Sequence, residues 1–432
     1  MKRIVVIGAG FAGFSTVRTL LKLASDRAEV VLVNPMDYAL YLPLLPEVAA
    51  GVLDARRVAV SLPGALPAAT LVLGDVDGID LAARTVSWTD PEGGRGGTAY
   101  DHLVIAAGSV HRLLPIPGLA EHAHGFRGIP EALYLRDHMT LQVEMAAAAS
   151  DPAERAARTT FVVVGAGYTG TEVAAQGVLA TRRQVARQRR LAGLRPRWLL
   201  LDTAERVLPE LDERLSRGAD RVLRERGVEV RTGVSVAEAR ADGVQLTDGE
   251  FVPSRSLIWC VGVRPDPLVE GLGLKLERGR LVVDEYLRVP GHPEVYACGD
   301  IAAVPDLTMP GRLTPMTAQH AERQGKRAGR NIAADLGHGR RRRYKHHDLG
   351  FVVDLGGGQA VANPLRVPLT GLPAYVVTRG YHLLALPGNR VRTLVDWTLA
   401  AVLPASAVQL GLVRGPQVPL DTSQAPDPPP VR

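Results

Sequence analysis

Cysteine is scarce in this sequence, and its two cysteines exclude a disulfide framework. Neither Cys260 nor Cys298 lies in a Cys-x-x-Cys pair or in the spacing of zinc ligands. We therefore expect both to be small buried side chains, and we predict no metal site.

Long apolar runs are also absent. No uninterrupted run approaches the roughly 18–20 residues that a membrane-spanning helix needs. The segment Met1–Gly13 lacks the long apolar region and the cleavage site of a signal peptide, and Ile4–Ile7 has the pattern of a strand that enters a glycine turn. The sequence therefore predicts an intracellular protein.

The charge balance narrows the range of partners. The formal net charge is +6, which would suit nucleic acid or an anionic membrane surface. Arginine outnumbers lysine throughout the chain, however, so the excess reflects a general compositional bias and we expect no nucleic-acid partner. Only the cluster Arg340–Arg343, with Lys345, His346 and His347, supports a separate hypothesis, attraction to anionic lipids.

An internal duplication organises the chain, whose 432 residues predict two or three domains. Lys2–Gly13 reads KRIVVIGAGFAG and Thr160–Gly170 reads TFVVVGAGYTG. In each copy a β-branched run meets a glycine turn, and a helical stretch and another apolar run follow. Two such βαβ units predict an α/β fold with two Rossmann-type dinucleotide-binding domains. The expected helices are Phe14–Ala24 and Thr171–Arg190, and the strands after them are Val30–Val33 and Trp198–Leu201.

The rest of the pattern predicts more strands and one further helix. From Tyr344 short strands and a loop are expected, followed by the apolar segment Val391–Leu403. That segment either packs as a core helix or lies in a membrane interface with Trp397 at headgroup level. The other predicted strands are Thr70–Leu73, Val86–Trp88, Leu103–Ala106, Val228–Arg231, Val244–Thr247, Leu257–Val261 and Val295–Cys298, and the helix runs from Thr317 to Leu336.

The two glycine turns carry the chemistry of the sequence. They match the G-x-G-x-x-G spacing, each directly after a predicted strand and before a predicted helix. The first glycine permits the tight turn, the second lets the backbone approach a pyrophosphate, and the third lets helix and strand pack closely. The free N–H groups of the helix N-terminus then face the phosphates. The residues are Gly8, Gly10 and Gly13 in the first copy and Gly165, Gly167 and Gly170 in the second.

An acidic residue is expected at the end of the next strand, where it accepts hydrogen bonds from ribose hydroxyls. In the second unit this is Asp202, whose charge favours NADH and repels the 2′-phosphate of NADPH. In the first unit Asn34 takes the place, and its amide oxygen still accepts a hydrogen bond but lacks the charge.

These motifs resemble a known family over most of the chain, from Met1 to about Val413. The sequence is similar to the flavoproteins with two dinucleotide-binding domains, and within them to the type II NADH dehydrogenases, the single-subunit NADH:quinone oxidoreductases. Besides the glycine turns, the resemblance is carried by Tyr41–Ala49, Gly74–Val76, Ala106–Gly108, Glu172, Gly262–Val263, Tyr296–Asp300, Ala318–Gln319 and Trp397.

The resemblance implies which residues meet each cofactor. The first glycine turn would hold the pyrophosphate of FAD, the backbone of Val76 its adenine, and Asp300 a ribityl hydroxyl. Ala107, Gly108 and Gly262 complete the expected contacts with the two dinucleotides. Hydride would pass from NADH to the flavin, and electrons then to a quinone. Glu172 would face nicotinamide and flavin, and Gln319 would hydrogen-bond a quinone carbonyl.

The resemblance also divides the chain into parts. We expect an FAD domain from residues 1–115 and 284–336, an NAD(H) domain from 116–283, and a smaller C-terminal α+β domain at 337–414. The C-terminal domain would face the inner side of the cell membrane or a second subunit. The proline-rich residues 415–432 are expected to be a disordered tail.

Alternative members of this architecture remain open. The flavoprotein disulfide reductases need a cysteine pair soon after the first βαβ unit, and none exists in residues 34–51. Sulfide:quinone oxidoreductases need cysteines against the flavin, a place for which Cys260 and Cys298 are candidates. A flavin-binding redox sensor of the apoptosis-inducing-factor type, with slow turnover, is the hypothesis from another class.

Overall fold

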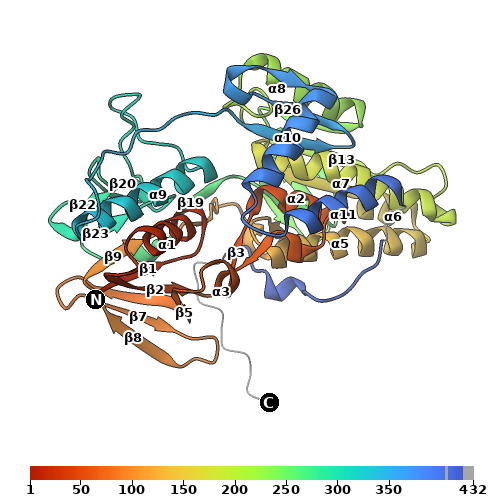
Figure 1. The fold of residues 1–432 in the computed structure, drawn as a ribbon. Helices are drawn as coiled ribbons and strands as arrows, with labels where there is room; N and C mark the ends of the chain where they lie inside the picture. Colours follow the sequence, from red (N-terminus) through yellow and green to blue (C-terminus); the bar gives the residue numbers. More distant parts are fainter. Residues whose placement is uncertain (404–406, 422–432) are drawn as a thin grey trace.

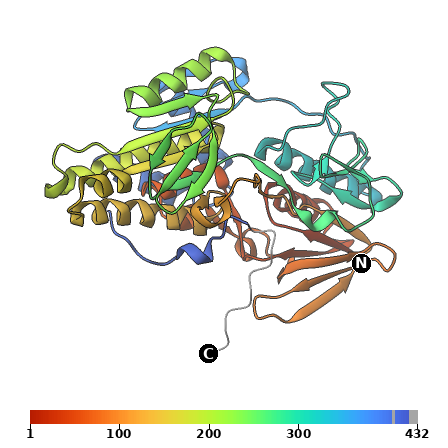
Figure 2. The same cartoon turned by 180° about the vertical axis from the view of Figure 1, so that it is seen from behind.

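Two parallel sheets form the framework of the computed structural model, which describes residues 1–403 and 407–421 (Figures 1 and 2). The first sheet has the order β22-β23-β9-β1-β2-β5, and the second has the order β11-β18-β12-β13-β14. The α/β prediction with two Rossmann-type domains is confirmed. The strands of the first sheet are β22 (Arg288–Val289), β23 (His292–Ala297), β9 (His102–Ile105), β1 (Lys2–Ile7), β2 (Ala28–Asn34) and β5 (Thr70–Leu73). Those of the second are β11 (Ala123–Gly125), β18 (Leu257–Trp259), β12 (Thr160–Val164), β13 (Arg197–Asp202) and β14 (Val228–Thr232).

The strands of the first sheet come from two stretches of the chain, one before the second domain and one after it. β23 pairs in parallel with β9, and β9 with β1, so the strand ends at Ile7, Ile105 and Ala297 meet at one edge. The chain leaves this sheet through β10 (Ser109–His111) and returns through β19 (Val263–Pro265), and these two crossing strands pair with each other. The two paired strands β10 and β19 thus connect the two domains.

Helix α1 (Phe11–Leu23) lies against α9 (Ala318–Asp335), and small residues allow the close approach. A Cβ on Gly325 would stand 2.0 Å from the carbonyl oxygen of Ala12, and one on Gly329 would stand 2.9 Å from that of Thr16. Both distances are far inside contact, so only glycine fits. This packing fixes the N-terminus of α9 near the first glycine turn.

Other elements cover the two sheets. An antiparallel sheet made of β6 (Asp75–Asp80), β7 (Thr85–Thr89) and β8 (Arg95–Ala99) extends from the first domain, beside the N-terminus in Figure 1. A second small sheet, β15 (Val236–Arg240), β16 (Gly243–Leu246) and β17 (Phe251–Pro253), belongs to the second domain. The second domain's helices include α5 (Ile129–Ala148), α6 (Pro152–Arg158), α7 (Tyr168–Arg187) and α8 (Glu213–Glu225), and the short α2 (Leu45–Ala49) packs against α5 and α7.

The C-terminal region packs on the second domain. It contains the antiparallel strands β25 (Val352–Gly356), β26 (Gln359–Ala362) and β27 (Leu369–Thr370), then helices α10 (Gly371–Ala385) and α11 (Arg390–Val402). Figure 1 shows these blue segments beside α8 and α7. Short strands were expected up to Val391, and for residues 371–385 that prediction is wrong. The run Tyr375–Thr378 is rich in β-formers, but packing against β25 and β26 makes it helical.

Two further expectations need correction. Helices α1 and α7 begin at Phe11 and Tyr168, three residues before the predicted starts, because each is capped by the second glycine of its turn and includes the third. Residues 415–421, assigned to a disordered tail, include the turn Gly415–Gln417 and bury Leu420, while residues 422–432 lie outside the described part. No helix in the described residues is long and apolar enough to cross a membrane.

Candidate dinucleotide sites and a buried carboxylate cluster

The two glycine turns have the same geometry. Gly8 and Gly165 have φ angles of +89° and +100°, which residues with a side chain rarely adopt. A Cβ on Gly13 would lie 1.8 Å from the carbonyl oxygen of Gly8, and one on Gly170 would lie 1.8 Å from that of Gly165. The first and third glycines of both turns are therefore required by the backbone itself.

The second glycine of each turn faces open space instead. A Cβ on Gly10 or Gly167 would meet no protein atom within 4 Å. Both residues are helix N-caps without a side-chain cap, so the first N–H groups of α1 and α7 have no side-chain partner from that position. An anion that approaches either turn meets free N–H donors and the positive end of the helix dipole. This arrangement fits a pyrophosphate at each turn.

Asn34 and Asp202 occupy equivalent positions and make the same hydrogen bond. The N–H of Ala9 donates to Oδ1 of Asn34 at 2.8 Å, and the N–H of Ala166 donates to Oδ2 of Asp202 at 2.6 Å. The other carboxylate oxygen of Asp202 accepts from the N–H of Ala204 at 2.8 Å. Both side chains, which the sequence assigned to ribose contacts, thus support the glycine turns.

The neighbouring strand ends repeat the symmetry. A Cβ on Gly8 would lie 2.5 Å from the carbonyl oxygen of Ala106, and one on Gly165 would lie 2.4 Å from that of Cys260. A glycine with positive φ lies three residues beyond the end of each strand, Gly108 at +83° after β9 and Gly262 at +69° after β18. Ala107 lies between Ala106 and Gly108, so these predicted contacts stand beside the turns they were expected to complete.

Asp300 follows β23 at the same edge as the first glycine turn. Its Oδ2 accepts a 2.8 Å hydrogen bond from the hydroxyl of Ser109, the first residue of the crossing strand β10. Burial raises the pKa of Asp300, and Ser109 lowers it in part. Val76 lies in β6 opposite Trp88, two residues beyond Gly74, whose N–H donates to the carbonyl of Asn34 at 3.1 Å. Both residues lie near the ends of first-sheet strands.

Glu172 lies in the first turns of α7 and is buried. Its Oε1 accepts a 2.9 Å hydrogen bond from the backbone N–H of Asp354, at the middle of β25. Burial raises the pKa of Glu172 well above its ordinary value, and the nearby carboxyl groups of Asp354 and Glu47 add to the rise. The rise favours the protonated form of the carboxyl group, although the hydrogen bond from the N–H of Asp354 lowers the pKa in part.

Glu172 belongs to a cluster that joins three parts of the chain. Arg379 of α10 contacts Oε2 of Glu47 at 2.8 Å and Oδ2 of Asp354 at 3.2 Å. The indole of Trp397 donates to the same Glu47 oxygen at 2.6 Å. Burial raises the pKa of Glu47 to about 8, although Arg379 and Trp397 both lower it. Two of the three carboxyl groups, those of Glu47 and Asp354, therefore share a single arginine.

Gln319 is the second residue of α9 and also points into the interior. Its Nε2 donates to the carbonyl oxygen of Gly350 at 2.6 Å. Its Oε1 is buried and has no partner in the described part of the chain. The unpaired acceptor is available to a ligand that brings a donor, and one amide N–H remains for a ligand carbonyl.

The two cysteines lie in different cores. Cys298 is packed in the first domain's core, and Cys260 lies against the second domain's core. Burial raises the pKa of each thiol to about 12. Both therefore remain protonated at neutral pH, and they do not form a pair.

The sequence did not reveal the whole cluster. It pointed to Glu172 and Trp397, and it quoted Glu47 within Tyr41–Ala49 without assigning it a role. Arg379 was missed because its segment was read as strand, and Asp354 because a single carboxylate in a short strand has no distinctive pattern. A buried carboxylate in an otherwise apolar segment, Leu44 to Val48, was the one available signal for Glu47.

Comparison with known proteins adds independent findings. The family of pyridine nucleotide-disulphide oxidoreductases matches residues 2–325. A type II NADH:quinone oxidoreductase of Mycobacterium tuberculosis is 31% identical over 415 residues, which cover 92% of this chain and 87% of that protein. An internal alternative NAD(P)H-ubiquinone oxidoreductase of potato, Solanum tuberosum, is 30% identical over 438 residues, with 93% and 86% covered.

Solved structures agree on the fold. NDH2 from Plasmodium falciparum, in complex with NADH, has a TM-score of 0.85 at 17% identity, with 94% of this chain and 99% of that chain covered. A sulfide:quinone oxidoreductase from Aquifex aeolicus has a TM-score of 0.70 at 19% identity, with 94% and 96% covered. At such identities the likeness concerns the fold alone.

Proposed function

This chain belongs to the pyridine nucleotide-disulphide oxidoreductase family and, within it, to the type II NADH:quinone oxidoreductases, and on that premise we propose that it passes electrons from NADH through FAD to a quinone. The observation that carries the proposal is the pair of glycine turns, each with an open space at its second glycine. Two such turns in one chain suit one dinucleotide that stays bound as a cofactor and one that binds and dissociates as a substrate.

The first turn and its neighbours would hold FAD. Gly10 and the N-terminus of α1 suit the pyrophosphate, and Asp300 at the end of β23 suits a ribityl hydroxyl. When bound, FAD accepts a hydride from NADH and delivers two electrons to the acceptor. The protein contributes the position of the cofactor and the exclusion of water.

The second turn would hold NADH. The carboxylate of Asp202 is fixed by Ala166 and Ala204, so its negative charge stays beside the turn and disfavours the 2′-phosphate of NADPH. Glu172 stands two residues beyond Gly170. Because its Oε1 accepts from Asp354, a proton on this carboxyl group would be carried by Oε2. Glu172 is thus a candidate to hold or move a proton beside the nicotinamide.

Gln319 is the candidate contact for the quinone. Its free Oε1 and remaining N–H match a quinol hydroxyl and a quinone carbonyl respectively. The packing of α9 on α1 keeps this side chain near the first glycine turn, where the flavin would lie. The proposed FAD site at α1 and the proposed acceptor site at α9 therefore lie on two helices that pack against each other.

A sulfide:quinone oxidoreductase remains the second candidate on fold alone, and the arrangement of Cys260 and Cys298 speaks against it. Anaerobic titrations of the purified holoprotein with NADH and with sulfide distinguish the candidate functions. We expect NADH, but not sulfide, to bleach the visible flavin absorbance, and a short-chain quinone to restore it over many turnovers. Reduction by sulfide would favour the second candidate, and a single slow turnover with NADH would favour a redox sensor.

The C-terminal helices are the proposed contact with the cytoplasmic face of the membrane. Large apolar side chains are exposed on both: Leu372, Val376 and Leu384 on α10, and Val391, Leu394, Val395, Leu399 and Val402 on α11. The indole N–H of Trp397 donates to the buried Glu47, so it is not free to bond to a lipid headgroup. The exposed aliphatic residues would make the contact instead.

A further inference from the structure

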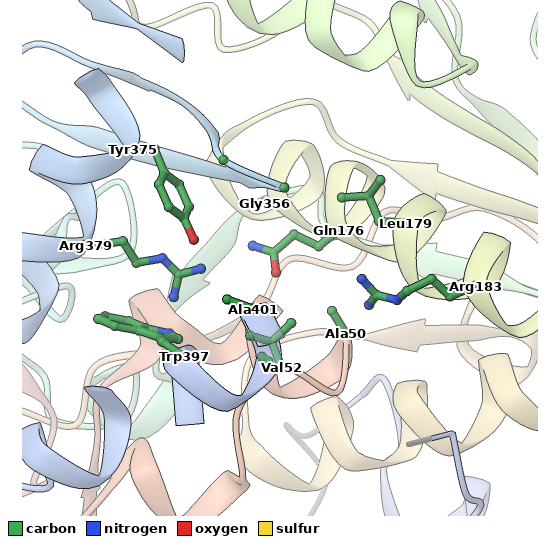
Figure 3. A pocket seen from close by; sticks show the side chains of 13 residues that line it. Ala50, Val52, Gln176, Leu179, Arg183, Gly356, Tyr375, Arg379, Trp397 and Ala401 are labelled. Carbon is green, nitrogen blue, oxygen red and sulfur yellow. The ribbon is translucent and has the colours of Figure 1, made fainter. Parts of the chain in front are cut away.

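A separate cavity of about 280 Å³ lies behind the carboxylate cluster, enclosed by α7, the β25–β26 turn, α10 and α11. Figure 3 shows the guanidinium groups of Arg183 and Arg379 entering it from opposite sides, with the hydroxyl of Tyr375 and the amide of Gln176 between them. Arg379 and Trp397 of the carboxylate cluster form part of its wall, and none of the residues proposed above to contact FAD, NADH or the quinone lines it.

The cavity is rich in positive charge. Arg183 has no acidic partner within ion-pair distance in the described residues. Arg226 braces the β25–β26 turn from outside, where it donates to the carbonyl oxygens of Leu355 and Gly356. In the described part of the chain, Arg183 and Arg379 line the cavity together with no acidic residue, and Arg379 is already paired with Glu47 and Asp354 outside the lining. Among the described residues, Arg183 is therefore the cation that the cavity offers without an acidic partner.

The turn that closes the cavity is built from glycine. Gly356, Gly357 and Gly358 have φ angles of +71°, +56° and +76°. Gly356 donates its N–H to Asp354, whereas the amides of Gly357 and Gly358 donate to no group in the described chain. Free backbone N–H groups in a tight turn are suitable donors to an anion. An anion in the cavity would thus gain backbone donors as well as arginines.

The rim of the cavity is apolar. Ala400 and Ala401 of α11 line it, and their neighbours Leu399 and Val402 expose 49% and 75% of their surface. On α10, Val376 follows the lining residue Tyr375 and is 62% exposed. A cationic cavity that opens beside exposed aliphatic side chains matches a molecule with an anionic head and an apolar tail.

We propose that this cavity binds the phosphate of an anionic phospholipid, with Arg183 as the main partner of the phosphate oxygens and the acyl chains along α11. The inference goes beyond the redox reaction and does not depend on it. A neutral quinone could accept a hydrogen bond from an unpaired arginine but brings no charge to neutralise it, whereas a phosphodiester forms charge-assisted hydrogen bonds with it and neutralises the charge. Free phosphate shares the head chemistry but would leave the apolar rim unused.

The test uses the purified holoprotein and calorimetric titration with soluble short-chain lipids. Dihexanoyl phosphatidylglycerol is the anionic probe, dihexanoyl phosphatidylcholine the zwitterionic probe and inorganic phosphate the probe without a tail. Arg183→Gln removes the proposed contact, and Arg187→Gln removes an equal charge one turn along α7, outside the cavity. We expect Arg183→Gln to weaken phosphatidylglycerol binding about tenfold or more, as loss of a charge-assisted contact predicts, and Arg187→Gln to have less than about a twofold effect.

Three outcomes would overturn the proposal. Equal losses in the two arginine variants would indicate diffuse attraction to the basic surface. Equal affinity for phosphatidylcholine would remove the anionic requirement, and equal affinity for inorganic phosphate would make this a site for soluble anions. Should Arg183→Gln lose flavin or fail to fold, Ala401→Glu replaces it. That exposed position lines the cavity, and a carboxylate there is expected to abolish phosphatidylglycerol binding.

Discussion

The indole Nε1 of Trp397 donates a 2.6 Å hydrogen bond to Oε2 of Glu47, a residue 350 positions earlier in the chain. The same oxygen accepts from Arg379, whose guanidinium carbon lies 4.2 Å from the centroid of the Trp397 ring. One buried carboxyl group therefore ties α10 and α11 to α2. The helices that expose the largest apolar surface are anchored through a titratable group.

The first prediction concerns the pH dependence that Glu47 causes. Its pKa is raised by burial to about 8 in the folded protein, above the ordinary value near 4.5. The folded state then binds a proton that the unfolded state releases, so stability falls as pH rises between these values, by at most about 1.4 kcal/mol per pH unit. Below this window the contribution is fully present.

Glu47→Gln keeps the hydrogen-bonding shape but cannot ionise. We expect its melting temperature to exceed that of the wild type increasingly from pH 5 to pH 8, as measured by differential scanning fluorimetry of the holoprotein. Glu144→Gln, at an exposed carboxylate of α5, is the matched control and should track the wild type. Parallel curves for Glu47→Gln and wild type would show that Glu47 is already ionised when folded.

The second prediction concerns the first glycine turn. It distinguishes a glycine that the backbone conformation requires from a glycine that only the bound ligand requires. Gly13→Ala forces a Cβ against the carbonyl of Gly8 and should lower both the melting temperature of the apoprotein and the flavin content. Gly10→Val projects into open space, so the apoprotein should fold normally while flavin is lost. The measurements are the flavin-to-protein ratio and the melting curve after flavin removal. A full complement of flavin in Gly10→Val would remove the pyrophosphate from this turn.

The glycine turns were predictable because their geometry is local: strand, turn and helix follow each other within a few residues. The same reasoning failed for α10, where Tyr375–Thr378 favours a strand by propensity and tertiary packing makes it a helix. It also missed the partnership of Glu47, Asp354 and Arg379. Those residues come from α2, β25 and α10, and only the folded chain brings them together.

The third prediction concerns the choice between NADH and NADPH. Asp202→Asn retains an oxygen acceptor for the N–H of Ala166, as Asn34 does for Ala9 in the first unit, and loses only the bond from Ala204, so the fold should survive. Loss of the negative charge should narrow the preference for NADH by about tenfold, the effect of roughly 1.4 kcal/mol of removed repulsion. Steady-state kcat/KM for both coenzymes measures it. A wild-type enzyme that uses both equally would contradict this role of Asp202.

The fourth prediction assigns Gln319 to the acceptor half of the reaction. Gln319→Ala should slow reoxidation of the reduced protein by a short-chain quinone about tenfold or more, through loss of a hydrogen bond to the acceptor, and leave reduction by NADH unchanged. Stopped-flow traces of the two half-reactions separate these steps. Gln188→Ala, just beyond the C-terminus of α7, is the control. An unaltered oxidative half-reaction would place the quinone elsewhere.

The last prediction concerns what holds the protein to a membrane. The basic cluster is a weaker candidate than the sequence suggested, because Arg341 pairs with Asp335 at 3.4 Å and Arg343 with Glu285 at 2.7 Å. Within the residues that the structure describes, no element covers the apolar face of α11, and Leu394 and Leu399 each expose 49% of their surface. Burial of two such side chains in the interface contributes on the order of 2 kcal/mol or more.

Leu394→Gln with Leu399→Gln should therefore reduce co-sedimentation with vesicles of mixed phosphatidylglycerol and phosphatidylcholine by about tenfold or more. NADH oxidation by a soluble quinone should not change, because both side chains are about half exposed and neither belongs to the Glu47 cluster. Met145→Gln, an equally exposed apolar position on α5, serves as the control. High salt should release little wild-type protein if aliphatic contacts dominate, whereas mild detergent should release it. Full release by salt, with no effect of the double substitution, would instead assign the attachment to charge.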